Sequence, residues 1–227
     1  MTPLQFSLPN GDFVRLEVAQ LLNAGYAGRD QGEVRAHIEE LAQLGILGPA
    51  TTPAMYPVSP YLAQQTDTVT VQHSRTSGEA EWALLHDGER FFLTLACDHT
   101  DRALEVHGVA WSKNASPDVL AAEAWPLDEI REHLDEIRVR AWVTVGEERS
   151  MIQDAALGAL MTPDAWIEKL RDLDLLKPGT VLLSGTPIML PDVDQFGRRW
   201  DLEMHDPVLD RTMSLGYDVE IMPEPIG

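Results

Sequence analysis

Along most of the chain after residue 65, apolar residues alternate with polar ones or form short apolar runs. Alternation with a period of two is typical of a strand with one buried face, and a short apolar run is typical of a fully buried strand. A further apolar run lies at 106–111. We predict strands over 68–72, 79–85, 90–97, 138–145, 180–183, 200–204 and 213–221.

Helical periodicity is less frequent. The spacing of apolar residues over 33–44 predicts an amphipathic helix that ends near a glycine. A second helix is predicted to begin at Thr162, because Thr is a good N-cap, Pro163 suits the first helical position and Asp164 places an acid in the first turn. It should run to about Asp172.

The N-terminal part is less regular. The dipeptide Asn10–Gly11 between two alternating segments predicts a β-hairpin. Glycines over 20–30 predict a loop, and prolines over 49–60 predict an extended connection. We therefore predict one β-rich α+β domain, with a hairpin, loop and helix in residues 1–65 and the strands in 66–227.

Composition narrows the classes of partner. The 227 residues are 44% hydrophobic and carry a formal charge of −20. Binding to nucleic acid or to anionic membranes relies on clustered Lys and Arg, so we expect neither partner. No apolar run approaches the roughly 18 residues of a membrane-spanning helix, and the first residues do not resemble a signal peptide. With Cys97 as the single cysteine, we expect a cytoplasmic protein.

Two carboxylates, Glu79 and Glu81, stand one residue apart in a predicted strand, and Asp98 follows the next strand. Residues i and i+2 of a strand point to the same face, so the two glutamates should converge. A turn at 86–88 would pair the strands as a hairpin and bring Asp98 beside them. Three converging carboxylates suit a hard divalent cation, which would offset their repulsion.

The alternative is that this pair is one solvated acidic pair among several. The chain has 37 acidic residues, and the same spacing recurs at 172/174 and 192/194. What distinguishes Glu79 and Glu81 is their apolar surroundings, where inward-facing acids require a compensating charge.

His37 and Glu40 lie three residues apart in the predicted helix and therefore share a face. A carboxylate beside a histidine orients the ring and raises its basicity, which suits a general base acting on water. The alternative is a solvent-facing pair on an amphipathic helix.

Other candidates are less distinctive. The turn at Gly185 and Thr186 could present a backbone N–H and a hydroxyl to an anionic ligand, or be a turn and nothing more. Lys113 could anchor a substrate carboxylate, although lysines are usually surface residues. His99, next to Asp98, could line the same site. Cys97 is interpreted as a buried structural thiol.

Taken in order, these segments resemble the fumarylacetoacetate hydrolase superfamily and, more narrowly, its uncharacterised DUF2848 branch. The narrower resemblance rests on the segments 76–81, 98–102, 123–129 and 205–209. It implies a mixed β-roll of the fumarylacetoacetate hydrolase C-terminal type, with a short helical N-terminal lid, assembled as a homodimer. The chain departs from the superfamily pattern at Cys97, where Asn commonly precedes the metal-binding Asp.

The resemblance also implies roles for individual residues. A divalent cation, Mg²⁺ or Mn²⁺, would be held by Glu79, Glu81 and Asp98. The expected catalytic residues are His37, Glu40 and Lys113. For substrate binding we expect Arg29, Arg102, Gly185 and Thr186.

The activity implied is metal-dependent hydrolysis of a carbon–carbon bond in a small 2-oxo or 1,3-dicarbonyl acid of acylpyruvate type. His37, held by Glu40, would activate the attacking water. Two alternatives stay open. One is a decarboxylase, hydratase or isomerase of a 2-oxo acid that works through a metal enolate. The other is a non-catalytic member of the fold that binds a small acid.

Overall fold

The protein is described by a computed structural model that covers residues 3–43, 48–49, 51–224 and 226–227. The four α-helices of this part are α1 (Gln31–Gln43), α2 (Val109–Lys113), α3 (Leu127–Ile130) and α4 (Pro163–Asp172), with short 3₁₀ turns at Pro60–Leu62, Arg131–Glu136 and Leu157–Ala159. The strands are β1 (Leu4–Ser7), β2 (Phe13–Leu16), β3 (Gln20–Gly25), β4 (Ala54–Val58), β5 (Ala63–Gln64), β6 (Thr68–Val71), β7 (Thr76–His86), β8 (Phe91–Asp101), β9 (Asp118–Leu120), β10 (Trp125–Pro126), β11 (Arg138–Val145), β12 (Glu148–Ala156), β13 (Thr180–Leu183), β14 (Arg199–Asp206) and β15 (Arg211–Ile221).

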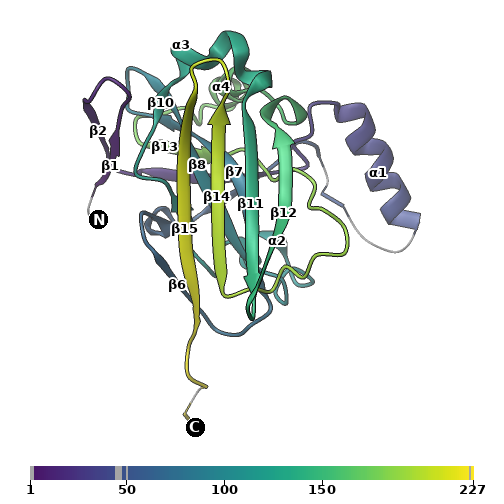
Figure 1. The fold of residues 1–227 in the computed structure, drawn as a ribbon. Coiled ribbons are helices and arrows are strands. Elements are labelled where there is room, and N and C mark those ends of the chain that lie inside the picture. The colour runs from purple at the N-terminus through teal and green to yellow at the C-terminus, as the bar shows by residue number, and fades with distance from the viewer. Residues whose placement is uncertain (1–2, 44–47, 50, 225) are drawn as a thin grey trace.

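The strands form two large mixed sheets and a separate hairpin. The eight-stranded sheet has the order β4-β3-β13-β7-β8-β9-β5, with β10 also paired to β8. The five-stranded sheet has the order β12-β11-β14-β15-β6. Figure 1 shows the five-stranded sheet in front of the other, with α1 projecting at one side and the β1–β2 hairpin at the opposite side. The predicted β-rich roll is therefore confirmed.

Two apolar cores cover the two faces of the eight-stranded sheet. The first lies between the sheets and includes Trp82 from β7 and Trp200 and Tyr217 from the five-stranded sheet. The second packs the β1–β2 hairpin, including Phe6, against residues such as Leu85. Because successive strand residues point to opposite faces, β7 supplies both cores. Both of its faces are buried along almost its whole length.

Several sequence predictions about local structure are confirmed. The β1–β2 hairpin forms with Gly11 at a φ of +88°, a backbone region that favours glycine. The first predicted helix is α1. Helix α4 begins as expected, with Thr162 Oγ1 accepting a hydrogen bond from the Ala165 N–H at 3.2 Å.

One expectation about local structure is wrong. The segment 20–26, predicted as a loop, contains β3, which pairs with β13 in parallel and with β4 in antiparallel fashion. Its glycines mark the end of that strand. The apolar run 106–111 is part of a turn followed by α2, and its Trp111 is 67% exposed. Strands β9 and β12 were not predicted.

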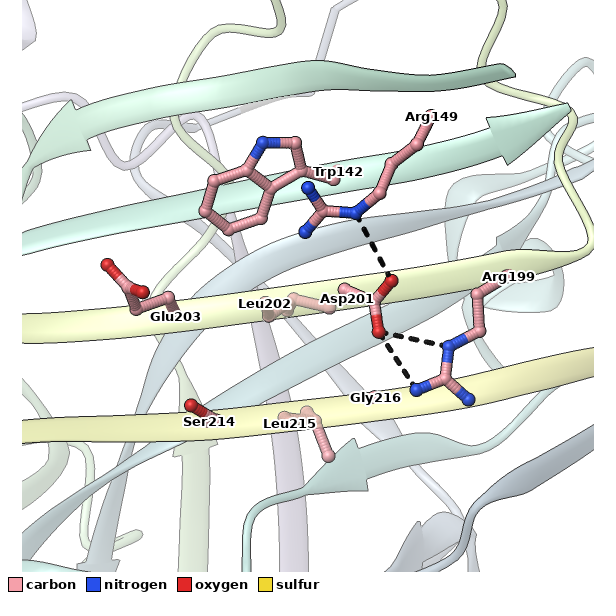
Figure 2. A pocket seen from close by; sticks show the side chains of 9 residues that line it. All are labelled: Trp142, Arg149, Arg199, Asp201, Leu202, Glu203, Ser214, Leu215 and Gly216. Carbon is pink, nitrogen blue, oxygen red and sulfur yellow. Dashed lines mark hydrogen bonds and ion pairs between the residues drawn. The ribbon is translucent and has the colours of Figure 1, made fainter. Parts of the chain in front are cut away.

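The outer face of the five-stranded sheet carries a shallow cavity of about 630 Å³ (Figure 2). Arg199 there donates two hydrogen bonds to Asp201, and the Arg149 guanidinium lies 4.4 Å from the centre of the Trp142 ring. None of the predicted site residues lines this cavity. Among the described helices, none is long and apolar enough to cross a membrane.

Candidate metal centre

The β7–β8 hairpin brings the three predicted acids together. The turn forms because the Asp87 carboxylate accepts hydrogen bonds from the backbone of Glu89 and Arg90 at 2.8 and 2.7 Å. The resulting register places Glu79 directly opposite Asp98.

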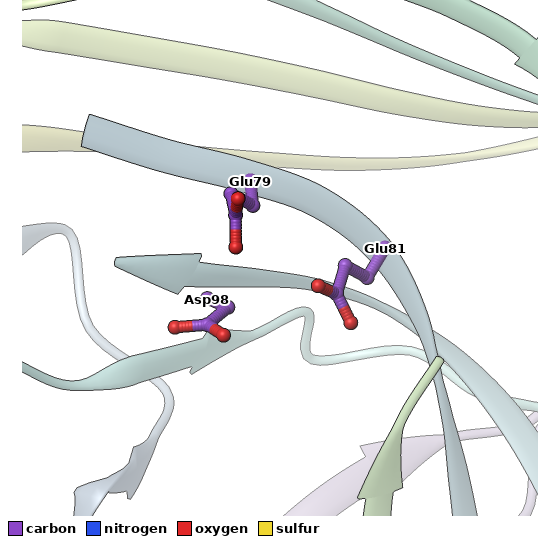
Figure 3. Close-up of side chains that lie close together, drawn as sticks. All are labelled: Glu79, Glu81 and Asp98. Carbon is purple, nitrogen blue, oxygen red and sulfur yellow. The ribbon is translucent and has the colours of Figure 1, made fainter. Parts of the chain in front are cut away.

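Glu81 lies two residues from Glu79 on the same face of β7. Ligand oxygens of all three acids lie within 4.8 Å of one another, and Figure 3 shows the side chains pointing toward a common centre. The predicted convergence is therefore confirmed, whereas binding of a cation stays a prediction. The acids are 8%, 1% and 0% exposed in chain order, so the centre is almost closed to solvent.

Two basic side chains balance part of this negative charge. Lys113, at the end of α2, donates to Glu79 Oε2 at 3.0 Å and also to Asp98 Oδ2. Arg102 donates to Glu79 Oε1 at 2.8 Å and to Ser77 Oγ at 2.7 Å. Lys113 and Arg102, two of the predicted site residues, therefore contact the acids directly.

The environments of the acids differ. Burial on its own would raise the pKa of Glu79, but Lys113 and Arg102 lower it to about 2. Burial, followed by repulsion from Asp98, raises the pKa of Glu81 well above its usual range. Burial would lower the pKa of Lys113, but the acids raise it well above its usual range, so Lys113 stays an ammonium. An additional positive charge would therefore stabilise the ionised form of Glu81.

A fourth buried acid, Asp118, was not predicted. It lies opposite Asp98 in the β8–β9 pair and is 0% exposed. Its Oδ1 accepts a hydrogen bond from Asn23 Nδ2 at 3.0 Å. Burial and then the Asp98 carboxylate raise the pKa of Asp118 well above its usual range. The only signal in the sequence was an acid directly before the apolar pair Val119–Leu120.

Three observations indicate that these residues fit a divalent cation. Glu81 Oε2 accepts a hydrogen bond from the Gly185 N–H at 2.7 Å, but the buried Glu81 Oε1 has no partner among the described residues. Oxygens that share one cation at about 2.0–2.6 Å lie at most about 5 Å apart, which the three acids satisfy. Four carboxylates also face only two basic side chains, so full ionisation would leave an excess that a divalent cation balances.

The turn at 185–187 is held beside this centre by a residue that the sequence did not indicate. Gln153 on β12 accepts a hydrogen bond from the Ala80 N–H, between the two glutamates, at 2.8 Å. Its Nε2 donates to Thr186 Oγ1 at 2.7 Å and to the Pro187 carbonyl at 3.1 Å. Gly185 and Thr186 are therefore both connected to the strand that carries the acids.

Arg29 and His99 do not face the acids. Arg29 donates to both carboxylate oxygens of Asp135, at 2.9 and 2.7 Å, and not to any of the acids of the centre. His99 points to the opposite face of β8, so the expectation that it lines the site is wrong. The backbone of His37 and Glu40 lies in α1, but their side chains fall outside the part of the chain that the structure describes.

Comparison with known proteins gives a family and a fold. A family model described as a protein of unknown function, DUF2848, matches residues 24–217. A search of curated proteins gave no match.

Among solved structures, 2-keto-3-deoxyarabinonate dehydratase has a TM-score of 0.67, with 15% identity over 94% of this chain and 78% of that chain. The same dehydratase complexed with magnesium and 2,5-dioxopentanoate has a TM-score of 0.63, with the same identity and coverage. A protein of Yersinia pestis CO92 assigned to the fumarylacetoacetate hydrolase family has a TM-score of 0.60, with 15% identity over 96% of this chain and 100% of that chain. At this identity the similarity establishes the fold.

Proposed function

Because the chain belongs to the DUF2848 family and has the fold of fumarylacetoacetate hydrolase-family proteins, we propose that it is a divalent-metal-dependent enzyme acting on a small 2-oxo or 1,3-dicarbonyl acid. The proposed reaction is hydrolysis of a carbon–carbon bond next to a carbonyl. The proposed cofactor is Mg²⁺ or Mn²⁺.

One observation carries this proposal: the convergence of Glu79, Glu81 and Asp98 in a buried centre where Glu81 Oε1 has no partner among the described residues. When bound, the cation would supply a Lewis acid that polarises the oxo group of the substrate. The magnesium complex of the structurally similar dehydratase supports this choice of cofactor.

The basic residues would hold the centre in shape and orient the substrate. Lys113 fixes Glu79 and Asp98 relative to one another, and Arg102 fixes the other oxygen of Glu79. Because Lys113 remains an ammonium, its proposed role is to attract the substrate carboxylate and not to remove a proton. Burial of the centre strengthens each of these interactions by lowering the local dielectric.

Substrate positioning is assigned to the 185–187 turn. The Thr186 hydroxyl is held by Gln153 and is therefore fixed before a ligand arrives, which reduces the entropy lost on binding. The Gly185 N–H donates to Glu81 Oε2, so Gly185 stays a proposed substrate contact that this hydrogen bond does not favour. His37, oriented by Glu40, is proposed to take a proton from the attacking water. Arg29 stays a proposed substrate contact that its pairing with Asp135 does not favour.

A second candidate is a lyase that removes water or carbon dioxide from a 2-oxo acid. It is favoured by the similarity to 2-keto-3-deoxyarabinonate dehydratase. The two candidates differ in their products, because hydrolysis of a carbon–carbon bond releases two smaller acids and a lyase does not.

We also propose a cytoplasmic homodimer, on the basis of the superfamily resemblance, and sedimentation equilibrium tests its stoichiometry.

A panel of acylpyruvates and other 2-oxo acids, followed by ultraviolet absorbance with Mg²⁺ or Mn²⁺, tests the proposal. We expect one class of substrate to be consumed and EDTA to stop the reaction. His37→Ala should lower kcat by about 10²–10⁴-fold, and His205→Ala, on the five-stranded sheet, should not. Absence of turnover across the panel would contradict an oxo-acid enzyme, and equal activity of the two variants would exclude His37 as the base.

A further inference from the structure

A chain of buried polar side chains lies on the face of the β7–β8 hairpin opposite to the acids. The Tyr217 hydroxyl contacts Cys97 Sγ at 3.1 Å and His99 Nδ1 at 2.9 Å. His99 Nε2 in turn contacts Thr76 Oγ1 at 2.9 Å. Cys97 and His99 are the two chain neighbours of Asp98, so one hydroxyl from β15 contacts the residues on both sides of a proposed cation ligand.

The Tyr217 hydroxyl reaches this position because Gly78 has no side chain. A Cβ at residue 78 would lie 2.7 Å from the Tyr217 hydroxyl and 2.7 Å from Cys97 Sγ. Gly78 pairs with His99 across the hairpin and directly precedes Glu79. The hydroxyl therefore lies against the residues next to both Glu79 and Asp98.

Two arrangements of protons satisfy all three contacts. In one, the Cys97 thiol donates to the Tyr217 oxygen, the Tyr217 hydroxyl donates to His99 Nδ1, and His99 Nε2–H donates to Thr76 Oγ1. In the other, each hydrogen bond runs in the opposite direction. These side chains are buried from water. Removing one of them would therefore leave its hydrogen-bond partners without a replacement.

We propose that Tyr217 is a positioning residue that fixes β8 at Asp98 and so sets the geometry of the cation centre. The inference rests on the proposed metal-dependent function. Mg²⁺ requires nearly octahedral geometry and tolerates little displacement of a ligand. Loss of groups that orient metal ligands typically lowers metal affinity by about 10–100-fold.

Calorimetric titration of Mg²⁺ and Mn²⁺ into wild type and Tyr217→Phe tests this role. Phenylalanine keeps the ring in the core and removes only the hydroxyl. We expect Tyr217→Phe to bind Mg²⁺ at least about 10-fold more weakly while remaining folded by circular dichroism. Leu170→Ala, in the buried face of α4, is the control, because it lowers stability without removing a hydrogen bond of Cys97, His99 or Tyr217.

Substitutions at Cys97 repeat the test with a smaller change. Cys97→Ser keeps a donor for Tyr217 and should retain Mg²⁺ affinity, whereas Cys97→Ala should weaken it. This pair applies even where Tyr217→Phe does not fold.

Three outcomes would overturn the inference. If the wild type binds neither metal, the proposed function fails together with it. If the wild type binds and both Tyr217→Phe and Cys97→Ala bind equally well, the positioning role alone is wrong. If Leu170→Ala loses as much affinity as Tyr217→Phe, the effect is one of general stability.

Discussion

At the scale of single residues, the defining feature is a group of buried acids that outnumber their basic partners. Lys113 contacts two of them and is 5% exposed. Removing one partner of a buried ion pair is costly because the remaining charge is left without compensation. Lys113 is therefore expected to stabilise the fold most when the centre holds no metal.

Lys113→Met is predicted to lower the free energy of unfolding by about 3–5 kcal/mol in EDTA. Saturating Mg²⁺ should restore part of this loss, because the cation supplies positive charge to Glu79 and Asp98. Urea unfolding with and without Mg²⁺ measures both values. Lys177→Met, at an exposed lysine, is the control and should change stability by less than about 0.5 kcal/mol. A variant as stable as the wild type in EDTA would show that the ion pairs are not needed.

The sequence predicted some of these residues and not others, for physical reasons. The i, i+2 spacing fixes Glu79 and Glu81 on one face, and the turn at Asp87 fixes the register with Asp98. Asp118 and Gln153 lie on strands that are brought to the centre by pairing with segments distant in sequence. No local sequence pattern identifies either of them as a site residue. The direction in which His99 points follows from strand alternation, so the expectation that it joins Asp98 overlooked that periodicity.

At the scale of elements, two hairpins carry the three acids of the centre and Tyr217. β7–β8 carries the acids, and β14–β15 carries Tyr217. The turn of the second hairpin is built around Asp206, which is 0% exposed. Its carboxylate accepts hydrogen bonds from the backbone of Val208 and Leu209 at 3.0 and 3.2 Å and pairs with His133 at 3.1 Å.

Asp206→Asn is predicted to lower the free energy of unfolding by about 1–3 kcal/mol at pH 6. Burial on its own would raise the pKa of Asp206. The hydrogen bonds from His133, Leu209 and Val208 lower it by more, so the folded pKa lies below that of the unfolded chain. The carboxylate's contribution is therefore complete above the unfolded value of about 3.9 and is lost as the pH falls through the folded value.

The difference between wild type and Asp206→Asn should shrink between pH 6 and pH 3, as measured by urea unfolding. Asp210→Asn, exposed at the end of the same turn, is the control at pH 6 and should change stability by less than about 0.5 kcal/mol. A difference that grows as the pH falls would contradict the assignment.

Thr162→Ala is predicted to destabilise α4 by about 1 kcal/mol, because the Ala165 N–H loses its acceptor. Thr162→Ser keeps the hydroxyl and should be nearly neutral. Thermal unfolding of both variants and the wild type provides the measurement. If Thr162→Ala melts at the same temperature as the wild type, the hydroxyl of Thr162 does not stabilise α4.

At the scale of the whole molecule, hydrophobic alternation predicted a strand-rich fold. It did not predict which strands, distant in sequence, pair in the same sheet. The segment 20–25 forms a strand of the eight-stranded sheet between β4 and β13, and β13 lies about 160 residues later in the sequence. β3, β4 and β5 all belong to the sheet that carries the acids. The single-domain organisation stays a prediction that these pairings favour.

The central claim is that Glu79, Glu81 and Asp98 bind a divalent cation, and thermal unfolding in Mg²⁺ or Mn²⁺ against EDTA tests it most directly. A cation at about 100 times its Kd contributes about 2.7 kcal/mol, which raises Tm by roughly 5–10 °C for a chain of this size. Glu81→Gln should abolish the rise without lowering Tm in EDTA, and the exposed Glu220→Gln should keep it. A wild type that melts at the same temperature with metal and with EDTA, or a Glu81→Gln variant that keeps the full rise, would contradict the account.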